Sequence, residues 1–366
     1  MSHQETITTN AIDLLKRMIA TPSYSKEEKA VADLIENELN ATGITTCRLL
    51  NNVYALNRHF DANKTSILLN SHHDTVKPAK GYTTDPFMPT LQEGRLIGLG
   101  SNDAGGPLVS LIATFVYFYE RTDLPFNLVL AATAEEEISG TNGIECLLKD
   151  DAFHASLQGS KITGALVGEP TKMAMAVAER GLLVLDGLVQ GKAGHAAREE
   201  GINAIYLALE DIQSIAKIPF EKTSELLGKT TAKVTVIETD NKAHNVVPAA
   251  CRFVVDVRVN ELYTFDEVLV QLKKNLKAEL TPRSFRLKST MIPMDHPIVK
   301  AGKQLGLAHY GSPTTSDKAL MNFPALKIGP GDSARSHTAD EYICISEIED
   351  GIAGYIELLE KTILLY

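Results

Sequence analysis

The sequence predicts an α/β fold, with a mixed sheet and flanking helices, that is interrupted by an inserted α+β domain. In the first half of the chain, near-continuous apolar runs alternate with helical stretches, as expected for strands buried on both faces of a sheet. From Gly181 the order changes to β-α-β-β-α-β, which is typical of a small ferredoxin-like domain.

The elements of the first part follow one another in a regular rhythm. The first predicted helix follows Ser25-Lys-Glu-Glu28, which has the form of a capping box, and its apolar residues recur at helical spacing up to Leu39. Three strands then alternate with two helices; the strands are expected at 66–71, 127–133 and 164–169, and the helices at about 105–119 and 140–149. Chemistry is expected to collect at the ends of such strands.

The inserted domain and the C-terminal part complete the organisation. In the insert, strands are expected at 182–190, 231–238, 252–259 and 284–289, and helices at 202–215 and 265–278. The last part has a helix, a strand with a Gly-rich loop at 324–332 and an amphipathic helix at 346–362, which are too few elements to fold alone. We therefore predict one α/β domain from residues 1–180 and 292–366, interrupted by an inserted lid domain at 181–291.

Composition excludes several classes of partner. The net charge is −10 and there is no long run of Lys and Arg, so neither nucleic acid nor an anionic membrane is expected to bind. No apolar block is long enough to span a bilayer and the N-terminal stretch is polar, so we expect a cytoplasmic protein that binds small molecules. The four cysteines form no C-x-x-C pair, which argues against a thiolate zinc site.

Histidine and carboxylate side chains follow several of the predicted strands. Two histidines and three carboxylates, without thiolates, suit two zinc or cobalt ions that share one carboxylate. Such a pair of ions lowers the pKa of a water molecule and polarises a carbonyl group, which indicates hydrolysis. The candidate ligands are His72, Asp103, Glu137, Glu169 and His337; Glu136 is the candidate general base, and Asp74 the candidate partner of His72.

Each of these residues also has a simpler interpretation. His72 could be only a polar strand end, Glu135 to Glu137 a solvated charge run, and Asp103 a helix N-cap. In the catalytic interpretation, neighbouring glutamates point in different directions, so that one binds metal and the other faces water. Asp74 then accepts the second ring N–H of His72.

Seven segments carry a resemblance to a known family: "SHHDTV", "GLGSNDAGG", "TAEEEISG", "VGEPT", "GKAGHAA", "HNVVP" with "DVR", and "GPGDSARSHTADEY". In these segments the chain resembles the M20 family of dinuclear zinc amidohydrolases and peptidases, and they cover nearly its whole length. The resemblance implies that His72 and Glu169 bind one metal, that Glu137 and His337 bind the other, and that Asp103 bridges both. It also implies that Glu136 is the general base and that Asp74 orients His72.

The resemblance also extends to the inserted domain. It implies that His195 reaches the scissile carbonyl oxygen, often in the active site of a partner subunit, that Asn245 and Arg258 contact substrate, and that the protein is a homodimer through this domain. Arg258 could instead pair with Asp256 or Glu261. Two departures change the charge near Asp103, because the family's usual Lys is absent from "DAGGP" and its usual Arg is Leu99.

These observations predict a metal-dependent hydrolase for the amide bond of N-acyl-L-amino acids. The expected cofactor is two Zn²⁺ ions, with Co²⁺ able to replace them, and Glu136 carries a proton from water to the leaving nitrogen. The expected substrate is N-acetylornithine or an analogue such as acetyl-lysine, succinylornithine or acetylcitrulline, which would place the enzyme in amino-acid biosynthesis, with arginine biosynthesis first. Two alternatives are a dipeptidase or carboxypeptidase of the same family and a non-catalytic metal-containing binding protein.

Overall fold

The computed structural model describes residues 3–198 and 200–366, and the chain divides into two compact units. The first unit contains the chain up to Val177 together with Ile292–Tyr310 and Ser316–Tyr366, and the second contains Ala178–Met291 and Gly311–Thr315. The short segment 311–315 groups with the second unit, although the sequence placed it in the catalytic part. We keep the predicted limits of the inserted domain, at 180/181 and 291/292, as a proposal.

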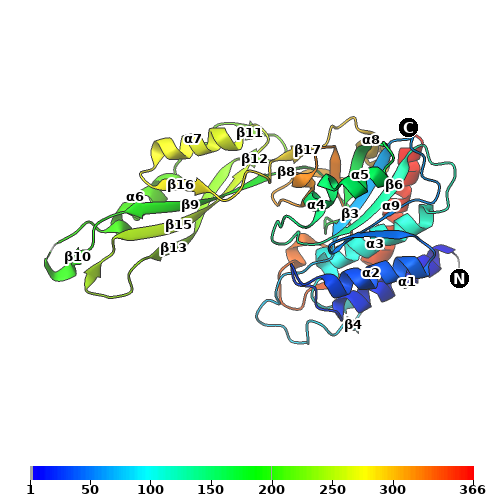
Figure 1. Cartoon of the computed structure of the whole chain (residues 1–366), viewed down its shortest axis with the longest axis horizontal. Helices are drawn as coiled ribbons and strands as arrows, with labels where there is room; N and C mark the ends of the chain where they lie inside the picture. The colour runs from blue at the N-terminus through cyan, green and yellow to red at the C-terminus, as the bar shows by residue number, and fades with distance from the viewer. Residues whose placement is uncertain (1–2, 199) are drawn as a thin grey trace. The chain divides into compact units, whose positions relative to one another are not determined.

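A mixed sheet forms the centre of the first unit, as predicted (Figure 1). Its order runs β1-β2-β6-β3-β7-β19-β8. The four strands β6, β3, β7 and β19 are parallel, and the strands on either side are antiparallel. The bounds are β1 Thr46–Leu49, β2 Asn52–Leu56, β3 Ser66–His72, β6 Asn127–Thr133, β7 Ile162–Val167, β8 Met175–Glu179 and β19 Ala325–Lys327.

Helices cover both faces of this sheet, because successive strand residues point to opposite sides. Leu68 and Val129 pack with α4, α5 and their neighbours in one apolar cluster. On the other side α3, which is buried along nearly its whole length, contacts β3, β6, α1 and α9. The helices of the first unit are α1 His3–Ile19, α2 Lys29–Ala41, α3 Gly106–Phe118, α4 Ile144–Lys149, α5 Asp151–Ser156, α8 Pro297–Gln304 and α9 Ile345–Ile363.

The N-terminal region differs from the prediction. The first helix is α1, which precedes the one predicted from the sequence. The capping box is also wrong, since α2 has Glu28 at its N-cap without a side-chain cap. The Ser25 hydroxyl instead donates to Asp74 Oδ2 at 2.7 Å. A contact distant in sequence thus replaces the local one.

A smaller three-stranded antiparallel sheet and short helices complete the first unit. The sheet consists of β4 Thr90–Gln92, β5 Arg95–Ile97 and β20 Tyr342–Cys344. Between β5 and α3 lies the short segment η1 Ser101–Gly105, in which the Asp103–Ala104 peptide is cis. The 3₁₀ turns are η3 Asp317–Leu320 and η4 Ser333–Arg335.

The second unit has the predicted order β-α-β-β-α-β. Its antiparallel sheet runs β13-β15-β9-β16, and the alternating burial of β9 and β15 gives it one apolar face against α6 and α7. The predicted strand at 284–289 is wrong, because the fourth strand lies earlier and follows α7 closely. The bounds are β9 Gly181–Gln190, α6 Ala204–Ile215, β13 Thr231–Thr239, β15 Ala250–Val259, α7 Phe265–Asn275 and β16 Glu279–Pro282.

Short strands account for the remaining pairings, at β10 Gly194–His195, β11 Thr223–Ser224, β12 Gly228–Lys229, β14 Val246–Val247, β17 Thr290–Met291 and β18 His309–Ser312. Among the helices formed by residues 3–198 and 200–366, none is both long and apolar enough to cross a bilayer.

Candidate metal centre

The carboxyl ends of the parallel strands bring most of the predicted ligands to one edge of the sheet. His72 is the last residue of β3 and is paired in register with Thr133, the last residue of β6. Glu136 and Glu137 follow β6, and Glu169 follows β7. His337 lies in the loop after β19, which is parallel to β7. Five segments that lie far apart in the sequence, including the one that holds Asp103, therefore meet in the first unit.

His72 is the most buried of these residues, with 1% of its surface exposed. Its Nδ1 lies 3.0 Å from the carbonyl oxygen of Asp74. Its Nε2 is buried and has no hydrogen-bond partner among the described residues, although it lies 3.4 Å from Asp103 Oδ1 and 3.9 Å from Glu169 Oε1. A buried nitrogen aimed at several carboxylates without bonding to any of them fits a metal ligand.

Two trios of residues could each hold an ion. They are His72, Asp103 and Glu137, and His72, Glu136 and Glu169, each with ligand atoms within 4.8 Å of one another. Donors about 2.0–2.2 Å from a tetrahedral zinc ion are themselves separated by roughly 3.4 Å, so the spacing fits such a group. The second trio includes Glu136, which the sequence assigned to the base.

Asp103 lies between the two histidines. Its Oδ1 is 3.4 Å from His72 Nε2 and its Oδ2 is 3.6 Å from His337 Nε2. Glu137 Oε2 lies 3.0 Å from the same His337 nitrogen. This carboxylate raises the pKa of His337 to about 9, with Asp103 adding to the effect. The two oxygens of Asp103 thus serve different neighbours.

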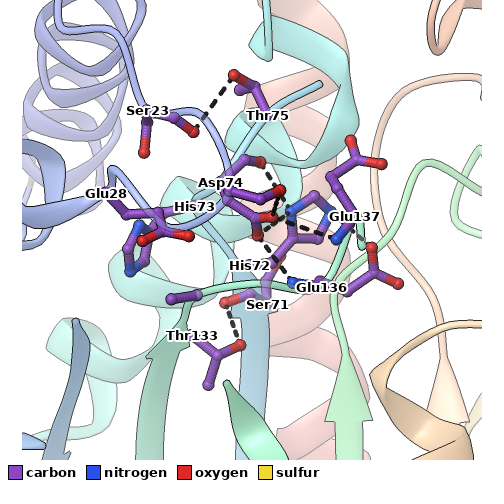
Figure 2. A network of polar contacts seen from close by, with 12 residues as sticks. Ser23, Glu28, Ser71, His72, His73, Asp74, Thr75, Thr133, Glu136 and Glu137 are labelled. Atoms are coloured by element: carbon purple, nitrogen blue, oxygen red, sulfur yellow. Dashed lines mark hydrogen bonds and ion pairs between the residues drawn. The ribbon is translucent and has the colours of Figure 1, made fainter. Parts of the chain in front are cut away.

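The Asp74 carboxylate contacts more than His72. Figure 2 shows its carboxylate beside the main chain of the acidic segment, where Oδ1 accepts the Glu136 N–H at 3.0 Å and Oδ2 accepts the Glu137 N–H at 3.2 Å. Its distance to His72 Nδ1 is longer, 3.4 Å. One buried carboxylate therefore fixes the backbone of Glu136 and Glu137.

The titration of Glu136 is shifted in the direction expected of a base. Burial raises its pKa well above the ordinary value, and the charges of Glu169, Asp317 and Glu137 act in the same direction, while His72 opposes them. Clusters of carboxylates with raised pKa values are common at functional sites because like charges are forced together there. A bound cation would relieve this repulsion.

Neighbouring residues build the turn that presents these glutamates. Glu135, at φ 56°, accepts the side-chain and backbone N–H of Asn142 with its two oxygens. Its carboxylate is buried, so the solvated charge run considered for this stretch is wrong for Glu135.

The loop that carries His337 also touches the Glu169 segment. Gly331 has φ 88°, as expected for a glycine that shapes this loop. Gly329 has another purpose, because a Cβ there would lie 2.6 Å from the carbonyl oxygen of Glu169. Gly329 therefore allows two segments that carry proposed ligands to lie close together.

Two buried carboxylates near the site were missed by the sequence interpretation. Asp317 accepts the Thr133 hydroxyl at 3.0 Å, and burial raises its pKa to about 7. Glu341 accepts backbone N–H groups from the segment that holds Asp103. Neither is preceded by an apolar strand, and each contact joins residues more than 180 positions apart, so no local pattern marks them.

The three predicted substrate contacts lie in the second unit. β10 and β14 bring His195 and Asn245 close together, since His195 pairs with Val246 and the Asn245 carbonyl accepts the Ala196 N–H at 3.1 Å. His195 is exposed. Arg258 donates to Asp256 through Nε at 2.8 Å and Nη2 at 3.0 Å, which is the alternative pairing considered above.

Comparisons with known proteins agree with this fold. The chain is 29% identical over 265 residues to a succinyl-diaminopimelate desuccinylase of Cereibacter sphaeroides, covering 69% of this chain and 68% of that one. It is 25% identical over 369 residues to succinyl-diaminopimelate desuccinylase 2 of a Ruegeria species, covering 92% and 91%. Among solved structures, the M20 family metallo-carboxypeptidase Sso-CP2 of Sulfolobus solfataricus superposes with a TM-score of 0.77 at 17% identity, covering 97% and 99%.

The family itself follows from a match over most of the chain. The model of peptidase family M20/M25/M40 matches residues 68–361, which include all the candidate metal ligands. Together with the metal-binding groups at the strand ends, this match shows that the chain is a hydrolytic enzyme and belongs to peptidase family M20/M25/M40.

Proposed function

We propose that this enzyme hydrolyses the amide bond of N-acyl-L-amino acids with two divalent metal ions, zinc in the first place. The proposed ligands are His72, Asp103, Glu137, Glu169 and His337. The observation that supports two ions best is the placement of Asp103, whose oxygens face His72 and His337 separately at 3.4 and 3.6 Å. A carboxylate in this position can be shared by two cations.

The proposed base is Glu136. Two bound ions would polarise the substrate carbonyl and lower the pKa of a water molecule. Glu136 then takes a proton from this water while the water oxygen adds to the carbonyl carbon. As the C–N bond breaks, Glu136 passes the proton to the leaving nitrogen. The Asp74 carboxylate accepts the backbone N–H of Glu136 and so fixes its main chain. Burial raises the pKa of the Glu136 carboxyl group, which makes the Glu136 carboxylate a stronger base.

The substrate class is supported by the relatives. Two relatives are named succinyl-diaminopimelate desuccinylases, a name that describes removal of an acyl group from a diamino acid. We propose N-acetylornithine or a close analogue, such as acetyl-lysine, succinylornithine or acetylcitrulline, and thus a place in amino-acid biosynthesis. A peptidase is the second candidate, because a structurally similar protein is named a metallo-carboxypeptidase and a peptide bond is the same amide.

The second unit is proposed to contribute His195, Asn245 and Arg258 to substrate binding, and to form a homodimer. Edge strand β13 exposes Val236 and Ile237, and exposed apolar edge strands favour pairing with another chain. Sedimentation at several concentrations would test the dimer, and a purely monomeric protein would contradict it.

The first experiment is the release of free amine from a panel of blocked amino acids, with zinc or cobalt present. The panel contains N-acetyl-, N-succinyl- and N-carbamoyl-ornithine, -lysine, -citrulline, -methionine and -diaminopimelate, together with several dipeptides. Preference for an acylated diamino acid or citrulline supports the proposal. Faster cleavage of dipeptides would replace it with the peptidase.

A further inference from the structure

Glu341 is a buried carboxylate that binds the main chain of a segment distant in sequence. It lies directly before β20 and only 2% of its surface is exposed. Its Oε1 accepts the N–H groups of Asn102 at 2.9 Å and Asp103 at 2.8 Å, and its Oε2 accepts that of Gly100 at 3.1 Å. Its own carbonyl accepts the N–H of Gly98 at 2.9 Å. One residue thus binds the main chain of 98–103 at four points.

The segment that it holds has little regular structure of its own. Asp103 has φ −119° and ψ 101°, which lie outside the helical range although helix α3 begins three residues later. A main chain in this conformation does not satisfy its N–H groups within a helix, so other groups must bind them. Glu341 supplies the acceptors, and it does so for the residue whose carboxylate faces both histidines.

The opposite side of this segment is tied to the loop that carries His337. The Asn102 amide donates to the Asp332 carbonyl at 3.0 Å, and its Oδ1 accepts the Asp332 N–H at 2.9 Å. The proposed bridging ligand is therefore held between two parts of the same C-terminal stretch.

We propose that Glu341 is a positioning residue for the metal centre: by fixing the backbone of Asp103 it sets the affinity for both ions. This inference rests on the proposed two-metal site. Glu341 belongs to neither of the ligand trios found among the described residues, so it acts through Asp103 and not as a ligand. Partners that orient a ligand typically change metal affinity by about 10–100-fold when they are removed.

Two variants and a matched control test the proposal. Glu341→Asp keeps the negative charge but is one methylene too short to reach all three N–H groups, and Glu341→Gln keeps the length but loses the charge and one acceptor. The control is Asp211→Asn in the second unit. Asp211 is equally buried, and it accepts the backbone N–H groups of Lys277 and Ala278 without contacting a proposed ligand.

Two quantities are measured for each variant. The first is the dissociation constant of zinc, obtained by competition with a chelating dye, and the second is the melting temperature in excess EDTA. We expect both Glu341 variants to bind zinc about 10–100-fold more weakly, and Asp211→Asn to bind it as the wild type does even though its melting temperature falls. Wild-type zinc affinity in Glu341→Asp would overturn the proposal, and this variant decides if Glu341→Gln does not fold. A wild-type protein that binds no metal would instead overturn the metal centre itself.

Discussion

At the residue scale, the proposed site contains carboxylates that lie close together but have different contacts. Glu136 and Glu137 are neighbours in sequence, yet Glu137 contacts His337 while Glu136 lies 3.9 Å from His72. Burial raises the pKa of both carboxyl groups, while His72 opposes this effect at Glu136 and His337 opposes it at Glu137. The contact with His337 supports the proposal that Glu137 binds metal, and Glu136 is the proposed base.

Glu136→Gln should retain bound metal and lose at least about 100-fold in turnover, because an amide cannot accept the proton of the attacking water. Metal content and kcat on the best substrate of the panel check this. Glu120→Gln is the control, since Glu120 is an exposed partner of Arg58. Near-normal turnover in Glu136→Gln would remove Glu136 from its role.

Asp74→Asn separates two functions of one carboxylate. The backbone carbonyl beside His72 remains, but one of the N–H groups of Glu136 and Glu137 loses its acceptor. We expect about a 10–100-fold loss in activity. Ser25→Ala, which removes only a hydrogen bond to Asp74, should have a smaller effect on the same assay. Equal activities of Asp74→Asn and wild type would contradict this role.

At the element scale, the strands at the centre of the sheet were predicted best. The strands β3 and β6 are buried throughout, have apolar runs in their middle, and were placed within one residue. Helix α1 was missed although its buried residues Ile7, Ala11, Leu14 and Met18 recur at helical spacing. The Ser25 capping box was wrong because the hydroxyl bonds to Asp74 instead. Strand β16 begins sooner after α7 than expected.

The proposed ligands were also easier to predict at the ends of strands than in loops. His72, Glu137 and Glu169 end or follow apolar strands, so the sequence indicates where they meet. The contacts of Asp317 and Glu341 depend on loop backbones that no periodicity describes. The sequence therefore predicts which residues meet, but it does not indicate what holds them in place.

Helix α7 offers a pH-dependent prediction. Thr264 and Glu267 form a capping box, and Lys222 lies 2.8 Å from Glu267, so that these contacts lower the Glu267 pKa from 4.5 to about 2. A lowered pKa stabilises the fold above pH 4.5, and this gain is lost as the pH falls toward 2.

Glu267→Gln should therefore melt at a lower temperature than the wild type at pH 7, and the difference should shrink between pH 4.5 and 2. Circular dichroism during heating measures both. Thr264→Ala, which loses an N-cap worth about 0.5–2 kcal/mol, should keep most of its effect over the same range. A pH-independent Glu267→Gln difference would show that the ionised contact does not stabilise α7.

At the scale of the whole molecule, each unit has its own apolar core, and every proposed metal ligand belongs to the first. Metal binding should therefore stabilise one unit selectively. Ions at 100 times their dissociation constant contribute about 2.7 kcal/mol per site.

Treatment with EDTA should lower amide protection from hydrogen exchange in 66–74, 98–105 and 325–341, while β9 and β15 stay protected. Mass spectrometry of exchanged peptides measures this, and re-added zinc should restore the original pattern. Equal loss of protection in both units would contradict selective stabilisation.

The parallel pairing of β7 with β19 also has a consequence for biosynthesis. The second unit is encoded between these two strands, so a ribosome makes it before the chain reaches His337. A nascent chain that has not yet passed residue 325 presents the carboxylates and only the first of the two histidines. Because domains fold as they emerge, metal loading would be a late event that can be completed only after His337 has been synthesised.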